Sequence, residues 1–193
     1  MARTIVVKVG TSSITDGEGV IDRALVAKLC DEVAVLRSDG ARVVVVTSGA
    51  IAAGLPALGM GGERRPSDSV TLQAVSAVGQ GNLIGTYQEA LGRHGLVAGQ
   101  VLLAPLDFFV RAQYLHARGT LTRLLELGVV PVVNENDAIA DDEIRFGDND
   151  RIGFNSNVNP NALSFCLSTS LLNIHSLSVS RKSSNKNWIK LFA

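Results

Sequence analysis

The chain has 193 residues, 46% of them hydrophobic and 19% charged, and its 18 basic and 18 acidic side chains give a formal net charge of zero. This length and composition are typical of a globular protein with one main domain, or one domain and a tail, and a substantial core. Because the charges balance, no overall field favours nucleic acid or a membrane surface as a partner.

The cysteines and the first residues limit the class of protein further. Cys30 and Cys166 lie far apart and belong to no CxxC motif or His/Cys cluster, so they indicate neither a disulfide framework nor a zinc site. Met-Ala-Arg before a short apolar run resembles neither a signal peptide nor a membrane span. A reducing cytoplasm is the expected location.

A strand is predicted over residues 4–9, a β-branched apolar run that contains one charged residue, Lys8. It ends in Gly10-Thr11-Ser12-Ser13, and a glycine followed by hydroxyl residues lets backbone N–H groups converge on an anion. Lys8 adds a positive charge beside this turn. The alternative is a plain turn with a lysine that extends its ammonium into solvent; a lysine inside the first apolar strand favours the anion site.

The second predicted strand, like the first, ends in a turn that contains glycine and hydroxyl residues. Apolar residues recur at helical spacing over residues 21–38, Gly40 provides a stop signal, and the valine run of residues 42–46 predicts a strand covered on both faces. The strand ends in Thr47-Ser48-Gly49-Ala50-Ile51-Ala52-Ala53-Gly54. Small residues at a strand-to-helix junction allow a ligand to approach the backbone, and they equally allow tight helix–sheet packing.

The remaining elements predict the fold class. Helical patterns cover residues 70–93 and 108–127, and strand patterns cover residues 97–103 and 129–133. Strands that alternate with helices favour a mostly parallel sheet with helices on both faces. The sequence contains neither the GxxxxGK[ST] motif of P-loop proteins nor the nucleophile elbow of hydrolases.

Acidic and amide residues concentrate directly after the last of these strands. Asn134-Glu135-Asn136-Asp137 follows the apolar run, and Gly147-Asp148-Asn149-Asp150 follows ten residues later. Such groups at the end of a buried strand are where an open α/β sheet presents its ligand-binding residues. An ordinary acidic surface loop is the alternative.

Composition divides the chain after residue 151. Residues 1–151 contain all 18 acidic residues, whereas residues 152–193 contain none and are rich in serine and asparagine. We expect a domain over residues 1–151 and a divergent tail over residues 152–193, with disorder over residues 178–190.

Taken together, Lys8-Val9-Gly10-Thr11-Ser12, the small-residue run at 47–54, Val133-Asn134-Glu135-Asn136-Asp137 and Gly147-Asp148-Asn149-Asp150 closely resemble the amino acid kinase family. The resemblance covers residues 3–151, with four motifs in order and in register. The run at 48–54 points to the branch that acts on L-glutamate rather than on carbamate, acetylglutamate, aspartate or uridylate. The family implies a three-layer αβα sandwich and transfer of the ATP γ-phosphoryl group to the glutamate side-chain carboxylate, which opens proline biosynthesis.

The resemblance assigns roles that the chemistry of each residue permits. Lys8, with Gly10, Thr11 and Ser12, would hold phosphate and stabilise the charge on the transferring group. The substrate-facing residues would be Ser48, Gly49, Ala50, Asp137 and Asn149, with Asp137 taking the α-ammonium. Asp148 and Asp150 resemble the acidic residues that orient active-site lysines. ATP with Mg²⁺, a homo-oligomer and proline feedback at the glutamate site are also implied; no residue is assigned as a metal ligand.

The chain departs from the family pattern after Arg151. Asn, Gly and Pro in residues 152–161 oppose the helix that the family begins there, and no glycine follows Gly153, so the glycine-rich nucleotide loop of the family is not encoded. We expect a fold that is incomplete in its C-terminal half and a kinase that is weak or inactive in this form. The alternatives are a non-catalytic amino-acid-binding or interaction module and another amino acid kinase.

Overall fold

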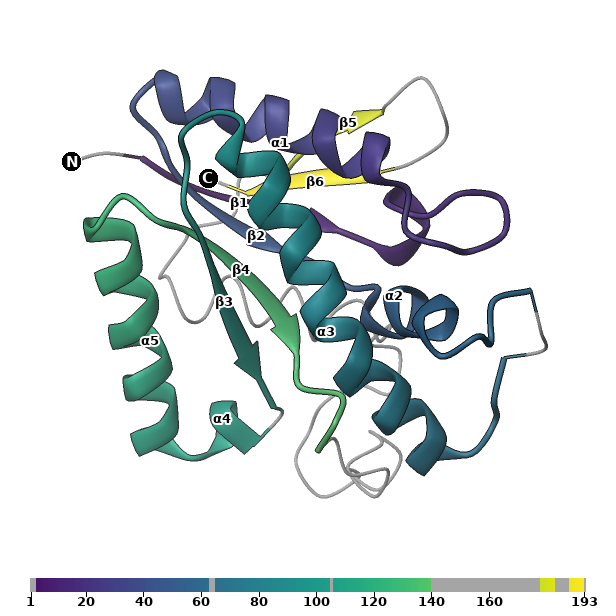
Figure 1. Ribbon diagram of the computed structural model, residues 1–193. Coiled ribbons are helices and arrows are strands. Elements are labelled where there is room, and N and C mark those ends of the chain that lie inside the picture. The colour runs from purple at the N-terminus through teal and green to yellow at the C-terminus, as the bar shows by residue number, and fades with distance from the viewer. Residues whose placement is uncertain (1–2, 63–64, 105, 140–177, 183–187, 193) are drawn as a thin grey trace.

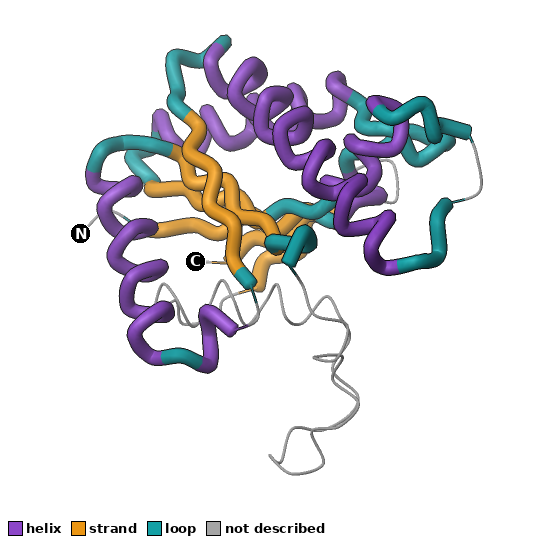
Figure 2. The backbone as a smooth tube through the Cα atoms, turned by 60° about the horizontal axis from the view of Figure 1, so that its bottom comes forward, coloured by secondary structure: helices purple, strands orange, loops and turns teal. Residues whose placement is uncertain are grey.

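The computed structural model describes residues 3–62, 65–104, 106–139, 178–182 and 188–192, and its strands form one sheet with helices on both faces (Figures 1 and 2). The strands are β1 (Thr4–Val9), β2 (Arg42–Val46), β3 (Ala98–Leu103), β4 (Val130–Glu135), β5 (Ser178–Lys182) and β6 (Trp188–Phe192). The helices are α1 (Arg23–Ser38), α2 (Ala50–Ala57), α3 (Ser69–Gly92), α4 (Leu106–Phe109) and α5 (Arg111–Glu126), and a 3-10 turn, η1, spans Thr11–Ser13.

The sheet order is β3-β4-β2-β1-β6-β5 within the described ranges. The first four strands in this order are mutually parallel, so the predicted α/β class with a mostly parallel sheet is confirmed. Parallel strands place all their carboxyl ends at one edge of the sheet. The segments that follow β1, β2 and β4, which carry the predicted motifs, therefore lie along the same edge.

Each face of the sheet has its own core. Val43 and Val45 of β2 pack against α1 and α3, whereas Val44 and Val46 pack toward α5. This alternation follows from the two-residue period of a strand, and it explains why β2 is an unbroken valine run. Figure 2 shows α1, α2 and α3 on one side of the strands and α4 and α5 on the other, which is the expected three-layer arrangement.

Helices α2 and α3 cross at a pair of glycines. A Cβ atom on Gly54 would lie 2.0 Å from the Val75 carbonyl oxygen, and one on Gly79 would lie 1.7 Å from the Ala50 carbonyl oxygen. Neither helix therefore tolerates a side chain at this crossing. The sequence left two interpretations of the small-residue run, ligand approach and tight packing. For Gly54 the structure supports tight packing between helices.

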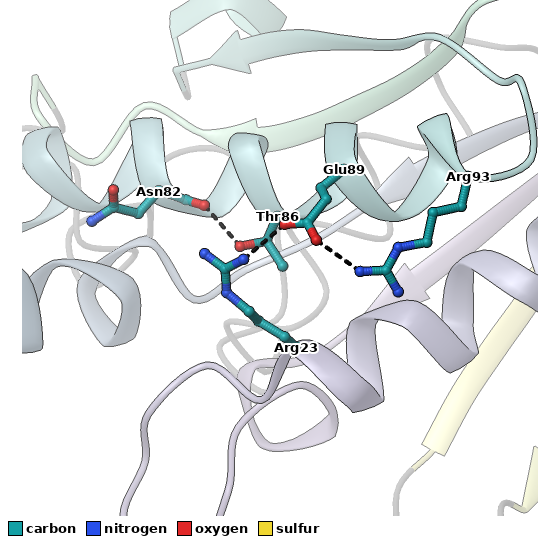
Figure 3. Close-up of polar contacts among 5 residues, drawn as sticks. All are labelled: Arg23, Asn82, Thr86, Glu89 and Arg93. Atoms are coloured by element: carbon teal, nitrogen blue, oxygen red, sulfur yellow. Dashed lines mark hydrogen bonds and ion pairs between the residues drawn. The ribbon is translucent and has the colours of Figure 1, made fainter.

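Helices α1 and α3 are also linked on the surface (Figure 3). Glu89 of α3 accepts from Arg93 at 2.7 Å and from Arg23 of α1 at 2.7 Å. The hydrogen bond from Arg93, together with the charge of Arg23, holds the pKa of Glu89 below its ordinary value. All three side chains are exposed, so water and salt screen this network and its contribution to stability is small.

The predicted helix over residues 108–127 is wrong in one respect, because two helices cover this region. Val110 has an extended conformation (φ −91°, ψ 107°) and separates α4 from α5. The Asp107 carboxylate accepts a hydrogen bond from the Ala104 N–H at 2.7 Å. Asp107 therefore stabilises a local turn at the start of α4, and Val110 interrupts the helical period.

Strands β5 and β6 lie largely in the range 178–190, for which the sequence suggests disorder. β5 and β6 form an antiparallel pair, and β6 runs antiparallel to β1, with Lys190 in register with Lys8. The sequence Trp-Ile-Lys-Leu-Phe has high β-propensity, and β1 has an edge whose backbone groups need partners. These two factors outweigh the polar composition of the tail. Among the described helices, none has the length and hydrophobicity that crossing a membrane requires.

Candidate functional site

The loops that follow β1 and β2 are in direct contact. The Thr11 hydroxyl donates to Ser48 Oγ at 3.0 Å, and Ser48 Oγ donates to the Val9 carbonyl at 3.4 Å. The predicted phosphate-binding turn (Gly10, Thr11 and Ser12) therefore lies against the predicted substrate loop (Ser48, Gly49 and Ala50). Both loops carry hydroxyl groups, and η1 and α2 begin in them without a side-chain cap on their first N–H groups. This combination suits an anionic ligand.

Gly49 shapes the substrate loop. It is the residue before α2 and has a left-handed conformation with φ of 111°. A Cβ atom there would lie 3.3 Å from Ile14 Cδ1 and 3.3 Å from Ile21 Cδ1. Both the backbone conformation and the space around it therefore favour glycine. The sequence motif signalled this position correctly as one that needs a small residue.

Replacing Gly49 with alanine should destabilise the protein by about 1–2 kcal/mol, the usual cost of a left-handed alanine. It should also weaken binding at the Ser48 loop, because the new methyl group presses on Ile14 and Ile21. Denaturant unfolding measures the first effect and ligand titration the second. Gly40→Ala is the matched control, since Gly40 has φ of 82° with no atom within 4 Å of an added Cβ. Equal loss of binding in both variants would contradict this account.

Asp137 lies just beyond the end of β4 and is half-buried. Its Oδ2 atom accepts a hydrogen bond from the hydroxyl of Ser76, a fully buried residue of α3, at 3.0 Å. Burial raises the pKa of Asp137, and the Ser76 hydrogen bond and the charge of Arg65 oppose that rise. Burial and the neighbouring Asp137 charge likewise raise the pKa of Glu135. A carboxylate in this setting is stabilised by a cation such as an ammonium group.

Asn134 belongs to a predicted motif, but the sequence assigned it no role of its own. It is 6% exposed, and its Nδ2 atom has no hydrogen-bond partner among the described residues. A buried amide donor without a partner costs free energy unless a ligand or water accepts from it. The available signal was its position, as the polar residue that follows the apolar run of β4. Its donor suits a carboxylate oxygen.

Lys8 lies on the other side of the sheet from α3. Ile5, Val7 and Val9 of β1 pack into the core under α1 and α3, so alternation directs the half-buried Lys8 toward the face that carries α5. The candidate site therefore has a lysine on one face of the carboxyl edge and Asp137 with Ser76 on the other. Asp148, Asn149 and Asp150 lie outside the described residues.

The fold is a mostly parallel α/β sheet, and the loops after β1, β2 and β4 lie at its carboxyl edge. This edge is where open α/β proteins place their ligand-binding groups. Residues 3–154 match the amino acid kinase family, and the chain belongs to that family.

Curated relatives are similar over the same region. Glutamate 5-kinase of Bifidobacterium animalis subsp. lactis is 52% identical over 151 residues, which are 78% of this chain and 40% of that protein. Glutamate 5-kinase of Salinispora arenicola is 53% identical over 151 residues, with the same coverage of both chains. Glutamate 5-kinase of Thermobifida fusca is 50% identical over 151 residues and is covered to 38%. The chain thus spans about 40% of the length of these relatives.

Proposed function

We propose that the chain binds L-glutamate at the carboxyl edge of the sheet and that this site serves phosphoryl transfer from ATP to the side-chain carboxylate. The observation that carries the proposal is a pair of polar groups near the end of β4. The acceptor, the Asp137 carboxylate, lies just beyond the strand, and the donor, the Asn134 amide, lies near its last residue. Asp137 offers a half-buried, oriented carboxylate for an α-ammonium. Asn134 offers an amide donor, without a partner among the described residues, for a carboxylate oxygen. The names of the similar proteins support glutamate as the amino acid.

The reaction forms a bond between a glutamate γ-carboxylate oxygen and the γ-phosphorus of ATP and breaks the bond from that phosphorus to the bridging oxygen. The products are γ-glutamyl phosphate and ADP. Lys8 and the backbone N–H groups of Gly10 and Thr11 are the donors suited to the transferring phosphoryl group, because charge on its oxygens is what they stabilise. The Thr11–Ser48 hydrogen bond keeps this turn beside the loop that carries Gly49.

Donor chemistry at the turn after β1 fits a nucleotide phosphate, since an ammonium, hydroxyls and backbone N–H groups all favour anions. Mg²⁺ accompanies ATP in the proposal, and it would neutralise part of the negative charge of the phosphates. Asp148 and Asp150 as orienting acids and Asn149 as a substrate ligand complete the proposed residue set. The proposal also includes a domain boundary at residue 151, proline feedback at the glutamate site, a cytoplasmic location and a homo-oligomer.

A non-catalytic amino-acid-binding module is the second candidate. It is favoured by the described contacts themselves, because Ser76–Asp137 and the unpartnered Asn134 amide suit recognition of an amino acid and require no nucleotide. The two candidates differ in whether a bound glutamate is phosphorylated.

Calorimetric titration with L-glutamate, followed by hydroxamate trapping of γ-glutamyl phosphate in the presence of Mg·ATP, tests both candidates. Lys8→Ala is the control, and its trapped product should fall about 10²–10³-fold if the lysine stabilises the transition state. Glutamate binding without trapped product would support the binding module. Absence of glutamate binding by a folded protein would contradict the proposed function in either form.

A further inference from the structure

Helix α3 presents a row of buried polar side chains to the site. Ser76, Gln80 and Tyr87 follow one another at spacings of four and seven residues, which places them on one face of the helix. Ser76 and Tyr87 are fully buried and Gln80 is 8% exposed. Polar groups buried at this depth carry a desolvation cost, so the bonds that each one makes are informative.

The C-terminal part of this face holds the loop after β2. Tyr87 OH and Thr47 Oγ1 are 2.9 Å apart, and Thr47 Oγ1 donates to the Ser48 carbonyl at 3.1 Å. A threonine hydroxyl has one hydrogen, so Tyr87 is the donor to Thr47 in this chain of bonds. Burial raises the pKa of Tyr87, which keeps the phenol protonated and able to donate.

The N-terminal part of the same face holds the segment after β4. Ser76 donates to Asp137 Oδ2 at 3.0 Å, and Gln80 Nε2 donates to the Glu135 carbonyl at 3.1 Å. Gln80 in turn accepts from Gln100 of β3 at 3.4 Å. One rigid helix therefore bonds to both of the segments that carry the proposed amino-acid ligands.

We infer that α3 sets the separation between the Thr47–Gly49 loop and the Glu135–Asp137 segment, and that Tyr87 and Ser76 are positioning residues for the amino-acid site. The inference rests on the proposed function for its ligand, and on the hydrogen bonds of Tyr87, Ser76 and Gln80 for its geometry. The close contact of Gly79 with Ala50 supports this inference. Gly79 lies between Ser76 and Tyr87 along α3, and there the helix backbone packs directly against the start of α2. Ser76 bonds to Asp137 Oδ2, and among the described residues no hydrogen bond is made to Oδ1, which suits an ammonium group.

The test compares Tyr87→Phe and Ser76→Ala with wild type by amide hydrogen exchange of the ligand-free protein. Each change removes one hydroxyl and leaves no large cavity. Tyr87→Phe should raise exchange about tenfold at residues 47–50, and Ser76→Ala should do so at residues 135–139, as expected from loss of one buried hydrogen bond. Residues of α1 should exchange as in wild type.

Thr86→Val is the matched control. Thr86 is a buried residue of α3 whose hydroxyl donates to the Asn82 carbonyl of the same helix at 2.9 Å (Figure 3). Losing that bond should leave exchange in both site segments unchanged. Uniformly faster exchange in Tyr87→Phe and Ser76→Ala, with a lowered Tm, would reveal a general structural role and overturn the inference, as would unchanged exchange in both segments.

L-Glutamate titration of the same variants supplies the functional readout. We expect the dissociation constant to rise about three- to tenfold in Tyr87→Phe and in Ser76→Ala, with Thr86→Val unchanged. The pH below which glutamate no longer binds should also be higher in Ser76→Ala. Asp137 keeps its charged neighbours Glu135 and Arg65 but loses the Ser76 hydrogen bond, which lowers its pKa. If wild type binds no glutamate, the proposed function fails, and the exchange experiment still decides the positioning role.

Discussion

Gly79→Ala should destabilise the protein by about 3 kcal/mol or more, at or beyond the upper end of ordinary overpacking. The new Cβ atom would lie 1.7 Å from the Ala50 carbonyl oxygen, 2.6 Å from the Gly54 nitrogen and 2.7 Å from the Ala50 carbonyl carbon. All three are backbone atoms, so no side-chain rotation relieves the contact. Helices α2 and α3 have to separate along their whole crossing. Urea unfolding monitored by circular dichroism measures the loss.

Gly85→Ala is the control for this prediction, because Gly85 belongs to the same helix and an added Cβ there meets no atom within 4 Å. Alanine is the better helix former, so this variant should gain about 0.5–1 kcal/mol. Opposite signs in the two variants would assign the effect to the α2–α3 contact. Similar stabilities in Gly79→Ala and wild type would show that the helices do not meet at backbone distance.

The consequence of Gly79→Ala extends to the site. Ala50 begins α2 and follows Ser48 and Gly49, while Ser76 and Gln80 flank Gly79 on α3. A helix displaced by the extra methyl group would carry its hydrogen bonds to Asp137 and to the Glu135 carbonyl away from β4. We therefore expect any Gly79→Ala protein that folds to bind L-glutamate more weakly, in addition to being less stable.

The sequence predicted the sheet better than it predicted the contacts between helices. The valine run of β2 and the apolar runs of β1, β3 and β4 have one stable arrangement, because residues apolar on both faces must be covered on both faces. Gly54 and Gly79 carry no such signal. Each is compatible with a ligand contact, a turn or a helix crossing, and only the path of the chain in three dimensions decides among them.

The candidate site was predictable where a motif directly follows a strand. Thr11, Ser48 and Asp137 all lie at the carboxyl edge, as their positions after β1, β2 and β4 indicated. The supporting residues were not predictable. Ser76 and Tyr87 lie within α3, far from any motif, and their function depends on which segments α3 crosses. Asn134 shows the same limit, since its missing partner is visible only when its burial is known.

Asp137→Asn should abolish measurable L-glutamate binding, weakening it about 100-fold or more, since removing a half-buried charge that pairs with an ammonium costs up to several kcal/mol. The substitution changes neither the size of the side chain nor its ability to accept the Ser76 hydrogen bond, so the loop after β4 should keep its shape. Calorimetric titration measures the loss, and Asp16→Asn, in the exposed hairpin before α1, is the control that should bind normally.

Stability should change in the opposite direction. Burial raises the pKa of Asp137, so the folded protein holds its proton more tightly than the unfolded chain and the ionised carboxylate disfavours the ligand-free fold. The ligand-free wild type should therefore gain stability as the pH falls from above the raised folded pKa toward the unfolded value. Asp137→Asn should lose that part of the pH dependence. At neutral pH the variant should therefore be at least as stable as wild type, because asparagine carries no charge to desolvate.

This combination of lost binding with retained or increased stability distinguishes a ligand-binding carboxylate from a structural one. A structural Asp137 would give the reverse result, with Asp137→Asn less stable at neutral pH and glutamate affinity reduced only in proportion to the unfolded fraction. Thermal unfolding across a pH series, measured with and without glutamate, separates the two. Saturating glutamate should raise the Tm of the wild type and leave that of the variant unchanged, since only a ligand that binds the folded state shifts the transition.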